Sequence, residues 1–154
     1  MTDGYIDQGT SALISVGVST LVSYLVAKRT SRETSAQAAL TAARDAVGST
    51  IEQIALAVKR YWRADGQDPK LESDIASLFD ALDLRLDVLF AHAIPIVLPE
   101  VVRARIDGLY TLSTGATYAT VGRVRDAGTV ERIKVLASDL RRSLIDLSLT
   151  PKLR

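Results

Sequence analysis

The apolar residues of this chain recur every three or four positions over most of its length, which is the spacing of one face of an α-helix. The longest stripe begins at Ala36 and continues for about seven turns without interruption. Its members are Ala36, Leu40, Ala43, Val47, Ile51, Ile54, Val58 and Tyr61. Asp65-Gly66 follows directly, so we expect one helix that ends just before these residues.

A second stripe follows Asp68-Pro69, a typical helix start because aspartate caps the first turn and proline fits within it. Its members are Leu71, Ile75, Leu78, Leu82, Leu86 or Leu89, and Ala93. The stretch 82–88 also alternates apolar and charged residues as a strand would, but the length of the whole stripe favours a helix.

Two further helices are expected in the C-terminal part. Pro95 and Pro99 enclose a short connection, and a helix is expected to start near Pro99. Residues 113–122 are rich in Thr, Gly and Tyr, so helix, strand and loop all stay open there. The last stripe follows Gly128-Thr129 and ends at Thr150-Pro151; its members are Val130, Ile133, Ala137, Leu140, Leu144 and Leu147. Four amphipathic helices with short connections predict an antiparallel bundle.

The N-terminal segment differs from these stripes because residues 9–27 are uncharged throughout. A helix of this length spans about 28 Å, close to the hydrocarbon thickness of a bilayer. Only acidic charges precede it, whereas three basic residues follow it closely: Lys28, Arg29 and Arg32. By the positive-inside rule, this pattern predicts a single pass through the cytoplasmic membrane, with residues 1–8 outside and a helical domain of residues 28–154 in the cytoplasm. The expected fold class is therefore all-α, with one N-terminal transmembrane helix followed by an antiparallel bundle of about four helices.

Alternatives to this topology stay open. Serines and threonines dilute the segment, and residues 14–19 alternate as a half-buried strand would. A buried element of a soluble assembly or a peripheral segment is therefore also compatible with the sequence. A cleaved signal peptide is not indicated, because its positive charge precedes the apolar run. Thr30 and Glu33 have capping-box spacing, so either a new helix starts there or the first helix continues unbroken.

Two sets of small residues are candidate surfaces for helix–helix contact. One face of the predicted membrane helix carries Ser11, Ser15, Ser19 and Ser23. In lipid such a face allows close approach and hydrogen bonding between helices; the alternatives are serines bonded to their own backbone, or a wetted pore lining. A seven-residue repeat places Gly108, Gly115 and Gly122 on a second candidate seam. These glycines form a seam if one helix runs through all three, and mark breaks if it does not.

Composition restricts the classes of function. The 19 basic and 18 acidic residues leave a net charge of +1, which is too balanced for a dedicated nucleic-acid binder. Because the sequence has no cysteine, disulfides, thiolate catalysis and cysteine-ligated metals are excluded. Aromatic residues make up only 5% of a chain that is 47% hydrophobic, which favours an aliphatic helical core over a β-sandwich.

The polar clusters include no recognisable catalytic, cofactor or metal site. Asp80, Asp83 and Asp87 share a helical face, but ligands on one straight helix diverge, so we expect a solvated acidic stripe. His92 has no Ser, Cys or acidic partner at a spacing that would indicate a catalytic site. The sequence also lacks a Walker loop, a dinucleotide fingerprint, a metalloprotease helix and a nucleophile elbow.

Basic residues form three small groups. Residues 59–63 interleave basic and aromatic side chains, for which packing is the expectation and contact with lipid headgroups the alternative. The other two groups are doublets spaced two apart, which diverge on a helix and are expected to pair with the acidic helix after Pro69. These doublets are Arg103 with Arg105, and Arg123 with Arg125.

The sequence therefore predicts a non-enzymatic interaction or scaffold protein without a cofactor. It is expected to contact membrane lipid, to self-associate, to bind an unidentified protein partner and not to bind nucleic acid. One alternative is a membrane-active oligomer, such as a holin-like protein, a toxin-like protein or a defence effector. The other is a soluble helical assembly protein.

Overall fold

The computed structural model describes the backbone of residues 7–94, 99–115, 118–147 and 149–151, and, except for Ile94, the side chains of these ranges from Ser23 onward. Within them lie four helices: α1 (Asp7–Arg63), α2 (Pro69–His92), α3 (Glu100–Ser113) and α4 (Ala127–Asp146). Two short strands, β1 (Ala93–Ile94) and β2 (Thr150–Pro151), pair antiparallel with Ala93 opposite Pro151. The predicted all-helical class is confirmed, and residues 82–88 are helical.

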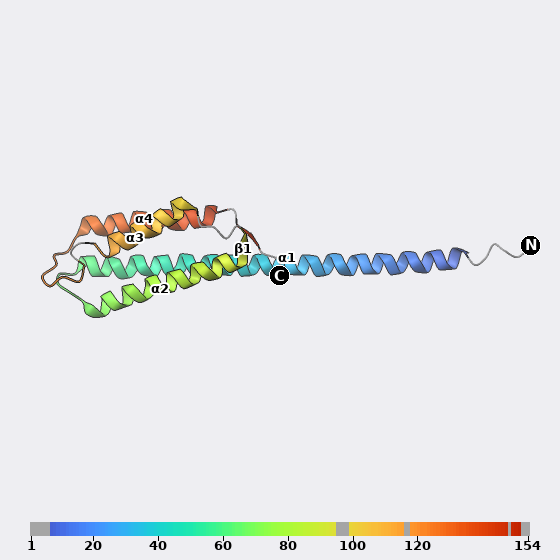
Figure 1. The fold of residues 1–154 in the computed structure, drawn as a ribbon, viewed down its shortest axis with the longest axis horizontal. Helices are drawn as coiled ribbons and strands as arrows, with labels where there is room; N and C mark the ends of the chain where they lie inside the picture. The colour runs from blue at the N-terminus through green and yellow to red at the C-terminus, as the bar shows by residue number, and fades with distance from the viewer. Residues whose placement is uncertain (1–6, 95–98, 116–117, 148, 152–154) are drawn as a thin grey trace, which may run out of the picture.

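The four helices form an antiparallel bundle in which successive helices alternate in direction (Figure 1). Helix α1 packs against α2 on one side and against α4 on the other, and α3 packs on α4. The ring of Phe79 in α2 meets that of Tyr110 in α3 at 5.1 Å, edge to face, which links the two outer helices. The predicted bundle topology is therefore confirmed.

The core consists of the apolar stripes that the sequence displays. The α1 stripe is buried from Leu40 to Tyr61, and Ile75, Leu82 and Leu89 of α2 face it. Helix α4 contributes Ile133 and Leu140 among others. Ala43 of the α1 stripe is 7% exposed and the other side chains of this set are at most 2% exposed, so the periodicity correctly identified the buried faces of α1, α2 and α4.

Helix α1 is continuous over 57 residues, so the second of the two alternatives for Thr30 holds. The Thr30 hydroxyl donates back to the carbonyl of Val26 at 3.0 Å instead of capping a new helix. Glu33 accepts a bond from Arg29 at 2.9 Å, one turn earlier. The capping box is therefore not formed, because its two side chains are engaged within a helix that already exists.

The N-terminal part of α1 extends well beyond the other three helices (Figure 1). Every residue from 23 to 35 is exposed, and Leu40 is the first buried side chain among the described residues. In the part of the chain that the structure describes, no helix is both long and apolar enough to cross a membrane. The structure thus supports the helical class and gives no support to the transmembrane helix; the side chains of residues 9–22 lie outside the description.

After Ser113, the described residues of the segment for which helix, strand and loop were open form a loop. Helix α3 ends at Ser113, and the described residues between Thr114 and Asp126 form turns. Helix α4 then starts one residue before Gly128, because Asp126 caps it by accepting bonds from the Thr129 amide and hydroxyl at 3.0 and 2.6 Å. At the start of α2 the predicted Asp68 cap is confirmed, with the Leu71 amide donating at 3.0 Å.

Candidate interaction surfaces

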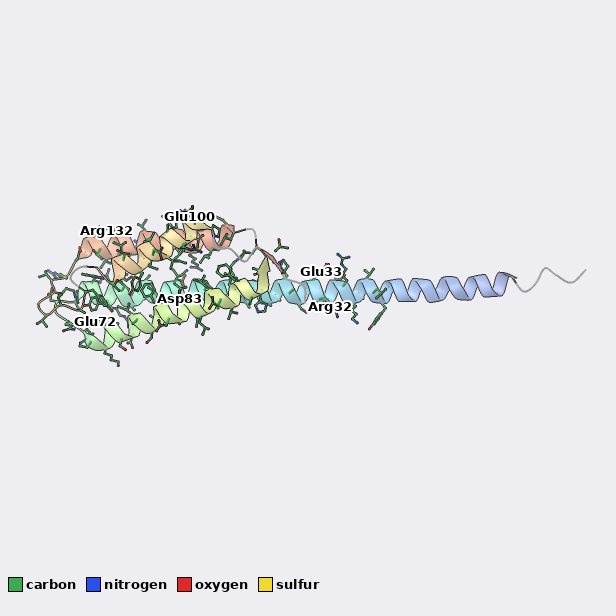
Figure 2. The ribbon with its side chains drawn as sticks, viewed as in Figure 1. Arg32, Glu33, Glu72, Asp83, Glu100 and Arg132 are labelled. Atoms are coloured by element: carbon green, nitrogen blue, oxygen red, sulfur yellow. The ribbon has the colours of Figure 1, made fainter. Side chains whose placement is uncertain are left out.

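The projecting part of α1 exposes apolar side chains close to basic ones. Tyr24, Leu25 and Val26 are 61%, 55% and 59% exposed. Successive helical residues point about 100° apart, so this apolar surface occupies more than one side of the helix. The predicted flanking residues Lys28, Arg29 and Arg32 follow immediately and are exposed as well. Figure 2 shows Arg32 and Glu33 on α1 beyond the ends of the other helices.

The serine face and the glycine seam have different outcomes. Ser23 is exposed, whereas the side chains of Ser11, Ser15 and Ser19 lie outside the described residues, so that interface stays a prediction. The condition for the glycine seam is not met, because α3 ends at Ser113, before Gly115 and Gly122.

Each glycine of the seam instead has its own local environment. A Cβ on Gly108 would lie 3.3 Å from Leu136 Cδ2, so this glycine allows α3 to pack closely on α4 within the bundle. Gly122 lies in a turn of the loop and has a φ of +81°. Residues other than glycine rarely adopt this backbone conformation. The glycines therefore mark breaks and a close internal contact.

A groove of about 390 Å³ runs between α1 and α4. Ile51, Leu56 and Ala137 contribute to its apolar lining, while Lys59 and Lys134 lie among its polar residues. A smaller depression of about 190 Å³ continues it along the same two helices. We call the two together the α1/α4 groove. The groove could not be predicted from the sequence, because the stripe pattern does not show which helices become neighbours.

The outer face of α2 carries the three predicted aspartates. Asp80, Asp83 and Asp87 are all exposed, together with Leu84 at 66% and Val88 at 46%. We call these five residues the acidic ridge; Asp83 is labelled on α2 in Figure 2. Among the described residues no ion pair involves these aspartates, and no group of three or more acidic or histidine side chains could hold a metal ion.

A polar and aromatic cluster closes the end of the bundle where α1 meets the loop between α3 and α4. The Tyr61 hydroxyl donates to Glu72 at 2.7 Å and accepts a bond from the Ala119 amide at 2.8 Å. The Tyr118 ring lies 4.9 Å from that of Tyr61, and its hydroxyl donates to the Glu72 carbonyl at 3.1 Å. These contacts join α1, α2 and the loop.

Arg123 covers this cluster, and its position contradicts the predicted salt bridge to the acidic helix. Its guanidinium lies 3.9 Å from the ring centre of Tyr61 and 5.3 Å from that of Trp62, and it donates to the Gly66 carbonyl at 2.7 Å. The residue is 3% exposed, and its Nε and Nη1 atoms have no partner among the described residues. The salt bridge expected between Arg123 and the acidic helix is therefore wrong, because the loop buries the guanidinium against aromatic rings.

The other basic residues also find partners different from those predicted. Arg105 donates to the backbone carbonyl of Asp139 in α4 at 3.1 Å, and no described ion pair joins Arg103 or Arg125 to α2. Trp62 is 3% exposed, so packing is confirmed for the aromatic part of residues 59–63.

The ionisable groups of the cluster stabilise the fold. Burial raises the pKa of Tyr61, and its bond to Glu72 adds to the effect. Burial, followed by the charge of Glu72, raises the pKa of Tyr118 to about 12. Both phenols are therefore protonated donors at neutral pH, which is the state that their hydrogen bonds require. His92 is half-buried at the end of α2.

No protein-family model, curated protein or solved structure matches this chain. The fold and its surfaces are therefore the basis for the functional argument.

Proposed function

We propose that this chain is a non-enzymatic helical interaction module, held at the cytoplasmic membrane by the N-terminal part of α1 and self-associating through its bundle. The observation that carries the proposal is the division of α1 into two parts. From Leu40 to Trp62 it forms the core of the bundle, whereas from Ser23 to Ser35 it touches no other helix. A helix with an exposed apolar section needs a second environment to cover it.

The apolar section favours lipid as that environment. A helix that is apolar on several sides is typical of a membrane or of a protein core. Residues 9–27 carry no charge, and Lys28, Arg29 and Arg32 follow at the point where a cytoplasmic lipid surface would begin. Basic residues near an anionic leaflet each contribute about 1 kcal/mol of attraction. By the positive-inside rule, this arrangement supports a topology with the N-terminus outside and the bundle in the cytoplasm.

The section of α1 between the apolar segment and the bundle argues against a soluble coiled coil as the structure that covers the apolar segment. Residues 28–39 contain no apolar side chain larger than alanine. A coiled coil along α1 would need large apolar residues at each a and d position, and would here lack them for about three turns. The same residues form a polar stem of about 18 Å that would hold the bundle away from the lipid surface.

Fractionation tests the proposal. After an alkaline carbonate wash, the wild-type chain should stay with the membranes. The double variant Val16→Arg, Val18→Arg should be released, because each arginine near the centre of a span costs about 2.5–3.5 kcal/mol. The matched control Thr30→Arg, Ser31→Arg adds the same charge within the stem and should stay bound. A wild-type chain found in the supernatant would instead favour the soluble assembly.

A further inference from the structure

We infer that the bundles associate side by side through two different surfaces, with the acidic ridge of α2 in one copy bound in the α1/α4 groove of a second copy. The inference deepens the self-association in the proposed function, because it names the two surfaces and the partner. Both surfaces belong to this chain, and each is left uncovered by its own helices.

The two surfaces have opposite charge. The α1/α4 groove is lined by four basic and two acidic side chains, a balance of two positive charges. Arg141 is paired with Glu52, and Lys134 makes an exposed ion pair with Glu131 at 3.3 Å, while Lys59 makes no ion pair with any described residue. The ridge carries three aspartates, and the only basic residue of that stretch, Arg85, is turned toward α1. Opposite potentials on two surfaces favour their contact and fix its register.

The apolar parts of the two surfaces also match in form. Leu84 and Val88 on the ridge leave 66% and 46% of their surface exposed. The groove offers them an apolar lining from Ile51, Ala55 and Val130. Laying one helix into the groove between two others is a common mode of helix recognition, in which a few apolar side chains serve as anchors.

The ridge and the groove lie at the same level along the bundle. Arg85 donates to the Ala46 carbonyl at 3.0 Å and also bonds to Thr50, so the middle of the ridge is level with these residues of α1. The groove extends along α1 from Arg44 to Lys59. The ridge runs from Asp80 to Val88, a rise of about 12 Å, and fits within that span of about 22 Å. Copies standing parallel in one membrane can therefore make this contact without sliding past each other.

The contact joins two different surfaces, so a pair of copies still has one groove free on the first copy and one ridge free on the second. Such heterologous contacts form rings or open chains rather than an isolated symmetric dimer. Both surfaces of one copy are covered only when it contacts two neighbouring copies, one through its ridge and one through its groove.

Disulfide crosslinking of the full chain tests the inference, since the natural sequence has no cysteine. Leu84→Cys on the ridge and Leu56→Cys in the lining of the groove replace exposed residues. Oxidation of the two variants mixed in the same membranes should give the mixed 84–56 dimer in excess over the 84–84 and 56–56 dimers. Val101→Cys, equally exposed on α3, is the control and should not crosslink with either. Absence of the 84–56 product, or a predominance of 84–84, would overturn the inference.

Charge reversal gives a second readout. Adding Asp83→Lys and Asp87→Lys to the Leu84→Cys chain should lower the 84–56 yield about tenfold, because like charges would then meet. Adding Lys59→Glu and Lys134→Glu to the Leu56→Cys chain should restore it, and failure of this rescue would contradict the proposed pairing. The same mixtures are also oxidised in detergent, where the ridge–groove contact does not depend on membrane anchoring. The 84–56 product should form there even if the carbonate wash shows that the chain is not anchored, so failure of one proposal can be distinguished from failure of the other.

Discussion

Arg123 is the residue whose observed environment differs most from the one predicted from the sequence. Its spacing from Arg125 predicted an ion pair with the acidic helix, yet the guanidinium is buried on the rings of Tyr61 and Trp62. Two backbone features bring it there: Ala119 and Gly122 have φ values of +59° and +81°, which turn the loop over the end of α1. A buried guanidinium is costly to desolvate, but cation–π contact and a bond to a carbonyl offset part of that cost.

Removing Arg123 should therefore loosen this end of the bundle. We expect Arg123→Ala to lower the free energy of unfolding by about 1–3 kcal/mol, from the lost ring contact and the lost charged hydrogen bond. The control is Arg125→Ala, whose exposed side chain should change stability by less than about 0.5 kcal/mol. Denaturant titrations followed by circular dichroism would measure both. Equal effects of the two substitutions would show that the cluster does not stabilise the fold.

The raised pKa of Tyr118 predicts a loss of stability at high pH. The pKa is about 12 in the folded chain, against about 10 for an unperturbed tyrosine. The folded state holds this proton more tightly, so the contribution is complete below pH 10 and is lost between about pH 10 and pH 12. Tyr118→Phe should unfold with a smaller pH dependence in this window. Identical pH profiles for the two proteins would contradict the burial of the phenol.

At the scale of elements, the sequence predicted the helices well and their connections less well. Stripes such as Leu40 to Tyr61 are long enough that only one face of one helix can bury them, so their helices were identified correctly. The loop from Thr114 to Asp126 has no period, and its path depends on contacts with residues about sixty positions earlier, such as Asp65 with Arg125. The α1/α4 groove also escaped prediction, because it depends on which helices become neighbours.

The α4 stripe gives a direct test of the core. Leu140 is fully buried, and Leu140→Ala should destabilise the bundle by about 3 kcal/mol through lost apolar burial and the cavity left behind. Val135 is on the exposed side of the same helix, at 53%, so Val135→Ala should cost far less. Thermal unfolding of the two variants compares the faces. A similar loss for both would mean that α4 does not pack as described.

At the scale of the whole molecule, one helix connects two different environments. Helix α1 is the central member of the bundle at one end and an uncovered rod at the other (Figure 1). The stem between these parts is polar and contains no glycine or proline, so the helix can transmit a fixed orientation from the proposed anchor to the bundle. That orientation would keep the ridge of each copy level with the groove of the next.

Thiol accessibility along α1 tests the proposed membrane anchor most directly. Single cysteines at Val18 in the apolar segment and at Ser31 in the stem would be labelled with a polar maleimide in opened membrane vesicles. The account predicts that the cysteine at position 31 reacts readily, whereas that at position 18 is protected until detergent is added, because only the apolar segment lies in lipid. Equal reactivity of both positions before detergent would contradict it.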